Sequence, residues 1–332
     1  MIRNRKILVL LLAIFFISLL GNLCLGSSGI PPIEIIRAAF RGDTESAPGR
    51  ILMYVRLPRM LAAILAGAGL SVAGLLLQSV LRNPLAAPSI IGVNSGAGLC
   101  ALIGMAVFPS MAKAVPFAAF LGACGAAFGV YLLARLTGAS RSTIVLAGVA
   151  VNSILGACMD AIITLIPDAS ISRAAFSIGG FANATLRQLA FAAPLCMVGI
   201  ATAILFKKEL EILSLGDDIA QSLGLPAERF RAVFLFAAAM LAGTSVSFAG
   251  LIGFVGLIAP HMTRILCKND SSLQLTITAI FGADLCLVCD LIARMLFAPY
   301  ELPVGIVLSM LGAPFFLFLL LSRKKRSRHN AA

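Results

Sequence analysis

Apolar runs of about 20 residues follow one another through nearly the whole chain, and this spacing limits the folds open to it. The hydrocarbon core of a bilayer is roughly 30 Å thick, and an α-helix crosses it in about 20 residues. In lipid the backbone must satisfy its own hydrogen bonds, so runs of this length predict helices. With 60% apolar and only 12% charged residues among 332, the chain is predicted to be an all-α integral membrane protein.

About ten runs are long enough to be membrane spans. The short eighth run is hard to separate from the seventh, because glycines punctuate the boundary between them. Residues 1–332 are expected to form one polytopic domain. The predicted spans cover about 7–25, 60–81, 90–109, 114–135, 143–166, 189–206, 231–249, 251–267, 273–296 and 303–321.

The basic residues between these runs predict the orientation of the chain. Cytoplasmic loops of membrane proteins carry an excess of Lys and Arg. Placing the N-terminus in the cytoplasm puts most of the 26 Lys and Arg residues on that side. An even number of spans then places both termini there. The polar insert at about 207–231 and the basic tail at 322–332 are expected on the same side.

An internal repeat relates the second span to the seventh. Residues 62–84 match residues 238–260 at a constant offset of 176 positions, and the matched residues include Gly67/Gly243, Ser71/Ser247, Gly74/Gly250 and Pro84/Pro260. Spans five apart cross the membrane in opposite directions, and an inverted repeat is an architecture of transporters. Convergent small-residue packing is the alternative explanation. Close helix packing is also predicted at two GxxxG pairs, Gly92/Gly96 and Gly125/Gly129.

Several classes of function are disfavoured by the sequence. The net charge of +12 comes from short basic clusters between apolar runs, and no nucleic-acid-binding motif occurs. There is no P-loop and no HExxH zinc motif, so neither an enzyme nor a metal site is expected. The eight cysteines lie almost all in apolar runs and are interpreted as packing residues, the pair Cys286 and Cys289 included.

The polar insert contains a short amphipathic helix, predicted from LGDDIAQSLGL at 215–225. Asp217 and Asp218 fall near the helix start, where the helix dipole favours acidic side chains. Gly224 and Pro226 are expected to end it. Such a helix lies on lipid or in a groove of a partner, and its acidic polar face favours the partner. The apolar stripe consists of Leu215, Ile219, Leu223 and Leu225.

Five arginines in one external segment run against the orientation rule. An outward basic cluster is suited to an acidic protein partner, although a solvated loop or contact with lipid headgroups is the alternative. Arg56 and Arg59, three residues apart at the mouth of the second span, favour the partner most. The other three are Arg37, Arg41 and Arg50.

Carboxylates within spans are costly in a bilayer and indicate function. Asp160 lies in the fifth span, and Asp284 and Asp290 lie in the ninth. Asp290 precedes Arg294 by four residues, which permits an ion pair on one helix face. Asp160 could line a polar path, and it is the main support for an alternative function, a proton-coupled secondary transporter. A membrane scaffold that moves no solute is a further alternative.

The chain resembles the FecCD permease family from about residue 54 onward. Four stretches carry the resemblance: RLPRMLAAILAGAGLSVAGLLLQSVLRNPLAAPSIIGVNSGAG at 56–98, LGDDIAQSLGL at 215–225, GFVGLIAPHMTR at 253–264 and ELPVGIVLSMLGAPFF at 301–316. It implies a ten-helix permease like that of the cobalamin importer, located in the inner membrane. The first 50 residues match only loosely, so the roles of Arg37, Arg41 and Arg50 stay open.

The resemblance also implies partners. They are a second permease copy, expected to form a homodimer, two ATP-binding subunits on the cytoplasmic side and an extracytoplasmic substrate-binding protein. The cargo would be an iron chelate (siderophore), haem or cobalamin. ATP and Mg²⁺ would be bound by the partner ATPase, with no cofactor in this chain.

Site residues follow from matching positions of this family. The segment that docks in the ATPase groove corresponds here to Leu215, Gly216, Asp217, Asp218, Ala220, Leu223, Gly224 and Leu225. Basic residues that meet acidic residues of the binding protein correspond to Arg56, Arg59 and Arg294.

Overall fold

The computed structural model describes residues 2–27, 29–107, 114–137, 141–166, 174, 176–267 and 273–329, with side chains between Lys6 and Phe318. Within these ranges all regular structure is helical. The basic tail predicted at 322–332 continues the last helix to His329, and its side chains and residues 330–332 lie outside the described part. The fold class predicted from the apolar runs is confirmed.

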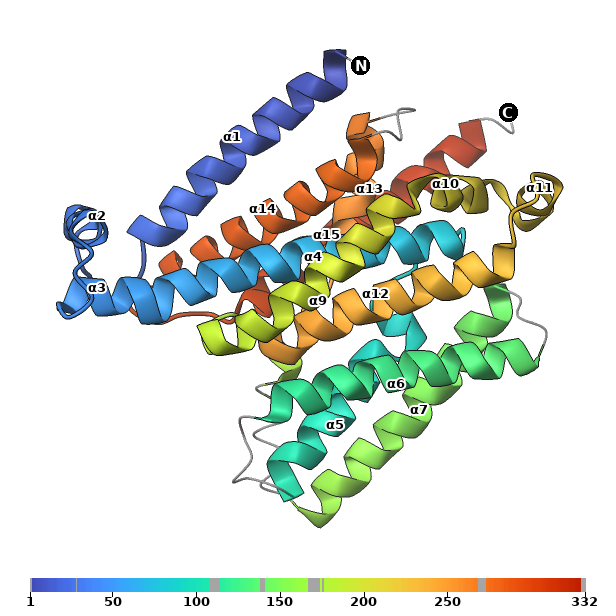
Figure 1. The fold of residues 1–332 in the computed structure, drawn as a ribbon, viewed down its shortest axis with the longest axis horizontal. Coiled ribbons are helices and arrows are strands. Elements are labelled where there is room, and N and C mark those ends of the chain that lie inside the picture. The colour runs from blue at the N-terminus through green and yellow to red at the C-terminus, as the bar shows by residue number, and fades with distance from the viewer. Residues whose placement is uncertain are drawn as a thin grey trace.

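Ten helices correspond to the ten predicted spans (Figure 1). Seven of the described helices are long and apolar enough to cross a membrane. The chain is thus a multi-pass membrane protein. The ten are α1 (Ile2–Cys24), α4 (Leu57–Val80), α5 (Val93–Val107), α6 (Val115–Leu136), α7 (Arg141–Leu165), α9 (Leu186–Leu205), α12 (Ala227–Ala249), α13 (Val255–Cys267), α14 (Gln274–Met295) and α15 (Val304–His329).

Two of the spans are shorter than the apolar runs predicted. Helix α5 begins at Val93, after a 3-10 turn (Pro88–Ile91) and Gly92 with φ of 82°. Helix α13 begins at Val255, after Gly250 and Phe254 with φ of 69° and 67°. Left-handed backbone interrupts an α-helix, so an apolar run continues through these positions while the helix does not. Next to these breaks, Ile91 and Ile252 are buried.

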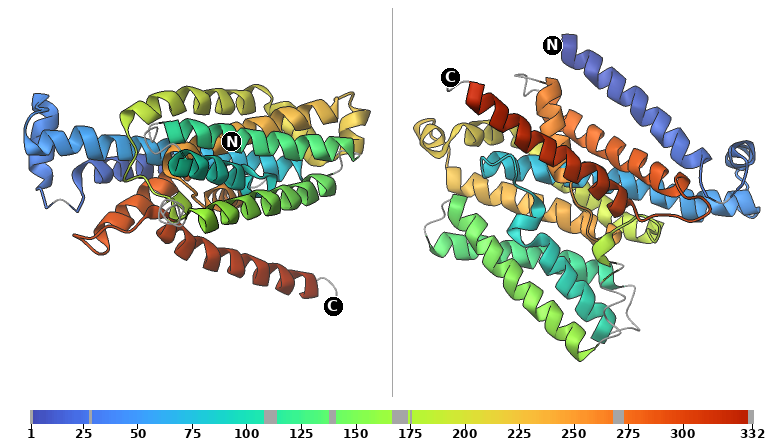
Figure 2. Two further views of the ribbon diagram at one scale, coloured as in Figure 1. Left: turned by 90° about the horizontal axis from the view of Figure 1, so that it is seen from below. Right: turned by 180° about the vertical axis from the view of Figure 1, so that it is seen from behind.

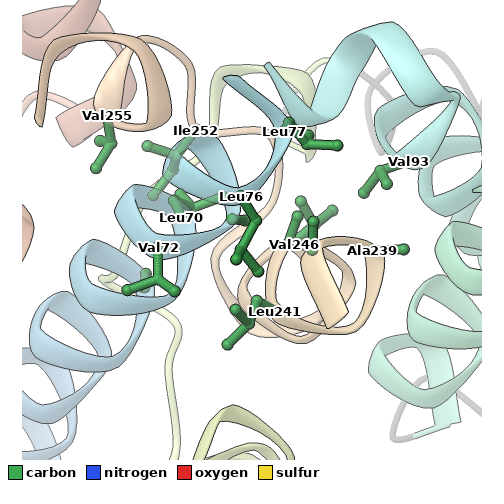
Figure 3. Packing of buried hydrophobic residues seen from close by; sticks show 14 of the residues in the cluster. Leu70, Val72, Leu76, Leu77, Val93, Ala239, Leu241, Val246, Ile252 and Val255 are labelled. Atoms are coloured by element: carbon green, nitrogen blue, oxygen red, sulfur yellow. The ribbon is translucent and has the colours of Figure 1, made fainter. Parts of the chain in front are cut away.

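Helices α4 and α12, the two halves of the predicted repeat, form the centre of the bundle. They run antiparallel side by side (Figure 1), and most of their side chains are buried. Leu76 of α4 gathers with Leu241 and Val246 of α12 between the two helices (Figure 3). Their opposite directions agree with the inverted repeat.

The packing around this centre follows the same symmetry. Helix α14 packs on α4 as α6 packs on α12, and α13 packs on α4 as α5 packs on α12. Under an offset of five spans, α14 is the counterpart of α6, and α13 is the counterpart of α5. Matched neighbours therefore surround matched helices, which convergent small-residue packing alone would not require.

Only one of the two GxxxG pairs makes the close contact predicted for it. A Cβ on Gly96 would lie 2.1 Å from the carbonyl oxygen of Gly122 on α6. A Cβ on Gly125 or Gly129 would meet no atom of the described chain within 4 Å. The prediction for this second pair was wrong within the single chain.

The bundle has two distinct ends (Figures 1 and 2). The inner end carries α10 (Lys207–Leu215) and α11 (Asp217–Ser222), and both chain termini lie toward it. The outer end carries α2 (Pro32–Arg41) and α3 (Ala47–Ile51). Helix α2 starts with a proline and ends at Gly42 in the left-handed conformation. Proline is common at the first position of a helix, and glycine is common just after the last. We keep the names inner end and outer end below.

Candidate functional site

At the inner end, α11 presents an apolar surface to the outside. Leu215 at the end of α10, Ile219 on α11 and Leu223 just after α11 are 55%, 47% and 62% exposed, whereas Ala220 of α11 is fully buried. The helix starts at Asp217 as predicted, and Gly224 follows it with φ of 75°. The N–H of Leu225 then donates to the carbonyl of Ala220. Leu225, the fourth residue of the predicted stripe, is instead half-buried against the core. We call Leu215, Ile219 and Leu223 the apolar face of α11.

Asp217 holds this helix against the membrane bundle. Its Oδ1 accepts hydrogen bonds from Nη2 of Arg141 on α7 and Nη2 of Arg231 on α12, both at 2.8 Å. Arg231 is buried. The guanidinium of Arg82, just after α4, lies over Gly216, whose positive φ of 139° is a backbone conformation that favours glycine. Two ion pairs therefore connect α11 to two membrane helices.

This arrangement corrects the sequence interpretation of the two acids. Both were assigned to the polar face offered to a partner, but Asp217 turns inward to the arginines, while Asp218 is exposed. The helix is only six residues long, so side-chain periodicity could not separate the two. Arg141 and Arg231 lie 76 and 14 residues from Asp217, and nothing in the sequence pattern pairs them.

At the outer end, the three arginines expected to meet a binding protein are buried. Arg56, Arg59 and Arg294 are only 2%, 4% and 3% exposed. Arg56 donates from Nη1 to the carbonyls of Leu23 and Cys24, both at 2.7 Å, at the end of α1. The outward exposure predicted for Arg56 and Arg59 was wrong, because this chain itself supplies their acceptors.

Asp290 and Glu301 are those acceptors for Arg59. Its Nε donates to both carboxylate oxygens of Asp290, at 2.9 and 3.0 Å, and its Nη1 donates to Glu301. The ion pair predicted between Asp290 and Arg294 is confirmed at 3.2 Å. Arg294 also donates to the side chain of Asn22 on α1 at 2.5 Å. We call Arg56, Arg59, Asp290, Arg294 and Glu301 the outer charge cluster.

The exposed basic residues of the outer end are different ones. Arg37, Arg41 and Arg50 on α2 and α3 are exposed, in the part of the chain where the resemblance was loosest. Sequence reasoning also missed Glu301, which lies 242 residues from Arg59. Its place in the stretch ELPVG, at the start of the last span, was the only signal available.

An open cavity of about 590 Å³ lies where the broken helices meet the start of α15. A smaller one, of about 100 Å³, shares part of its wall. The polar groups of the large cavity are few, and its wall is mostly backbone and aliphatic. This is the candidate pathway surface of the single chain. The residues that line the large cavity are Asn94, Ser177, Ile178, Leu251, Gly253, Gly305, Ile306, Ser309 and Met310.

The carboxylates singled out within spans lie elsewhere. Asp160 is exposed on α7 and lines neither of these two cavities. Asp284 is buried on α14 and accepts a hydrogen bond from Ser18 of α1 at 3.2 Å. Among the described residues, no group of three or more His, Cys, Asp or Glu side chains could hold a metal ion.

Known proteins are similar to this chain in sequence and in fold. The chain is 36% identical over 325 residues to the Fe(3+)-citrate import system permease protein YfmD of Bacillus subtilis, covering 98% of this chain and 96% of that protein. It is 32% identical over 332 residues to the hemin transport system permease protein HmuU of Yersinia pestis, covering 97% and 99%.

Solved structures of transporters have a similar fold. An ABC transporter of the metal-chelate type, in an inward-facing conformation, matches with a TM-score of 0.82 and 27% identity over 96% of this chain and 99% of that chain. PsaBC from Streptococcus pneumoniae, at 17% identity and a TM-score of 0.60 over 86% and 94% of the two chains, shares the fold.

The model of the FecCD transport family matches residues 10–322. This range includes the apolar face of α11, the outer charge cluster and the cavity. The chain therefore belongs to the FecCD transport family.

Proposed function

We propose that this chain is the permease subunit of a binding-protein-dependent ABC importer that carries an iron chelate, haem or cobalamin into the cytoplasm. A second copy would complete the pathway, two ATPase subunits would sit at the inner end, and a binding protein would dock at the outer end. Both termini would then be cytoplasmic, in the inner membrane. The names of the relatives, an iron-citrate permease and a hemin permease, support the substrate class.

The observation that carries the proposal is the exposed apolar face of α11, fixed to the bundle through Asp217. An amphipathic helix with apolar side chains in a row is the kind of element that a hydrophobic groove of a partner receives. Leu215 and Leu223, which lie on either side of α11 and outside the apolar spans, are each more than half exposed in the described chain. A groove on an ATPase subunit would cover them.

The same geometry suggests how movement reaches the membrane. When ATP binding draws the two ATPases together, a docked α11 moves with them. Asp217 then pulls on α7 through Arg141 and on α12 through Arg231. Helix α12 packs along α4 at the centre of the bundle, so the displacement reaches the core. The equilibrium between the two states of the pathway can be shifted only by contacts that differ between those states. The ion pairs of Asp217 with Arg141 and Arg231 are suited to be such contacts.

Cargo would pass along the cavity at the start of α15. Its wall carries few polar groups and no charged side chain. Such a surface makes weak, unselective contacts, and the choice of chelate would therefore rest with the binding protein. This division agrees with the different cargoes named for relatives of similar identity.

The test is purification of the tagged chain from its own membranes in mild detergent, with mass spectrometry of its companions. We expect a stoichiometric P-loop ATPase. We also expect proteoliposomes of the complex, with the binding protein added outside, to take up ferric citrate, ferric hydroxamate or haem only when ATP is enclosed in the lumen, because an importer moves its cargo toward the side of its ATPase subunits. A chain that purifies alone and moves solute with a proton gradient would overturn the proposal.

A further inference from the structure

Glu301 forms the solvent-facing part of the outer charge cluster. Its carboxylate accepts hydrogen bonds from Arg59 and from the hydroxyl of Ser27. The side chain of Glu301 is 31% exposed, compared with 5% for Arg59 and 0% for Asp290. Glu301 therefore covers Arg59, and it is the one acid of this cluster that water reaches.

The balance of charge in the cluster favours another acid from outside. Arg56, Arg59 and Arg294 carry three positive charges, and Asp290 and Glu301 carry two negative ones. Removing Glu301 would leave a buried guanidinium poorly compensated, which is unfavourable where water is excluded. An incoming carboxylate that takes the same position would restore the pairing at little cost. The exposed basic residues of α2 and α3, at the same end, would attract a partner that carries such acids.

Glu301 also lies directly before the helix that forms part of the cavity wall. It lies between α14 and α15, and the N–H of the next residue, Leu302, donates to the carbonyl of Ala293 on α14. Helix α15 starts at Val304, and Gly305 then packs directly against the backbone of residues 178 and 179. Four residues of α15 line the cavity, namely Gly305, Ile306, Ser309 and Met310. A change at Glu301 therefore acts on the first turn of a helix that forms the cavity wall.

We propose that Glu301 is an internal stand-in for an acidic side chain of the docking protein, and that docking exchanges one carboxylate for the other on Arg59. Once released from Arg59 and Ser27, Glu301 no longer connects the segment before α15 to the start of α4 and to the residues that follow α1. The exchange would transmit docking at the outer end to the cavity wall. The identity of the partner rests on the proposed function, but the covering of Arg59 by Glu301 does not.

The first test measures how well Glu301 protects Arg59. The full chain in lipid nanodiscs is treated with phenylglyoxal, and modification of each arginine is followed by mass spectrometry of peptides. We expect Glu301→Gln to raise the modification rate of Arg59 several-fold relative to exposed Arg37 in the same molecule. Ser27→Ala, which removes one hydrogen bond and no charge, should give a smaller rise. Glu34→Gln, at an exposed acid on α2, is the matched control and should change nothing.

The second test measures the exchange itself, with a hexaglutamate peptide as the acidic probe. We expect the peptide to bind Glu301→Gln several-fold more tightly than the wild-type chain, and to slow phenylglyoxal modification of Arg59 in that variant. Equal Arg59 modification rates in the wild type, Glu301→Gln and Ser27→Ala would overturn the covering role. A faster rate without tighter peptide binding would overturn the exchange.

These outcomes are separable from failure of the proposed function. If no ATPase accompanies the chain and no ATP-driven uptake occurs, the importer proposal fails, whatever the reactivity of Arg59. If uptake is normal but Glu301→Gln leaves both Arg59 and peptide binding unchanged, the importer proposal stands and the role of Glu301 fails.

Discussion

The backbones of Gly67 on α4 and Gly282 on α14 are in direct contact. A Cβ on Gly67 would lie 2.3 Å from the carbonyl oxygen of Gly282, and a Cβ on Gly282 would lie 2.4 Å from that of Gly67. Association of helices in lipid depends on such close packing, because the bilayer supplies no hydrophobic force between them. The contact also joins the centre of the bundle to the helix that carries Asp290 and Arg294.

Gly67→Ala is therefore expected to destabilise the chain. Either α4 and α14 move apart or the backbone shifts, and overpacking of this kind costs about 1–3 kcal/mol. The measurement is the midpoint of thermal unfolding in detergent. Gly125→Ala is the matched control, since Gly125 lies in a helix and meets no atom of the described chain. An equal midpoint for the two variants would contradict the contact.

Asp217→Asn tests the link between α11 and the membrane helices. We expect ATP-driven uptake to fall about tenfold, which corresponds to a loss of roughly 1.4 kcal/mol in coupling. Asp218→Asn, at the exposed neighbour, should keep normal uptake. Equal effects of the two single variants would contradict a specific role for Asp217.

The apolar face of α11 is tested by replacing Leu215, Ile219 and Leu223 together with serine. We expect the ATPase subunit to dissociate during purification, because hydrophobic contacts in its groove are lost, while membrane insertion of the chain is unchanged. Leu136→Ser, at an exposed leucine at the inner end of α6, is the control and should keep the ATPase bound. Retention of the ATPase by the triple variant would rule out this face as its docking site.

Asp160→Asn separates the importer from the proton-coupled alternative. Asp160 is exposed on α7 and lines neither cavity, so we expect ATP-driven uptake within about twofold of the wild type, as for most surface substitutions. A proton-coupled carrier would lose uptake altogether. Transport by proteoliposomes with ATP, and with a pH gradient alone, distinguishes the two.

The sequence predicts local relationships well and distant ones poorly. The ten spans follow from the apolar runs, and the Asp290–Arg294 ion pair follows from helical spacing of four residues. The left-handed backbone at Phe254, which shortens α13, leaves no trace in hydropathy. Likewise the partners of Arg59 come from α14 and the segment after it, and only the packed structure brings them together. For this reason the sequence predicted an exposed Arg59 and the structure has a buried one.

The same distant pairing makes stability depend on pH. Burial raises the pKa of Glu301, but the hydrogen bonds from Ser27 and Arg59 and the charges of Arg59 and Arg294 outweigh it, so its pKa lies below the ordinary value of 4.5. A carboxyl group with a lowered pKa stabilises the folded chain above its unfolded pKa, and this stabilisation is lost as the pH falls through the folded pKa.

We therefore expect the wild type to unfold at a higher temperature than Glu301→Gln at pH 7, with the difference shrinking as the pH falls below about 4.5. Asp290, which also faces Arg59, is present in both proteins. Glu34→Gln, which removes an exposed acid from the same end, should follow the wild type throughout. A difference between wild type and Glu301→Gln that is constant from pH 7 to pH 3 would mean that Glu301 acts through its shape rather than its charge.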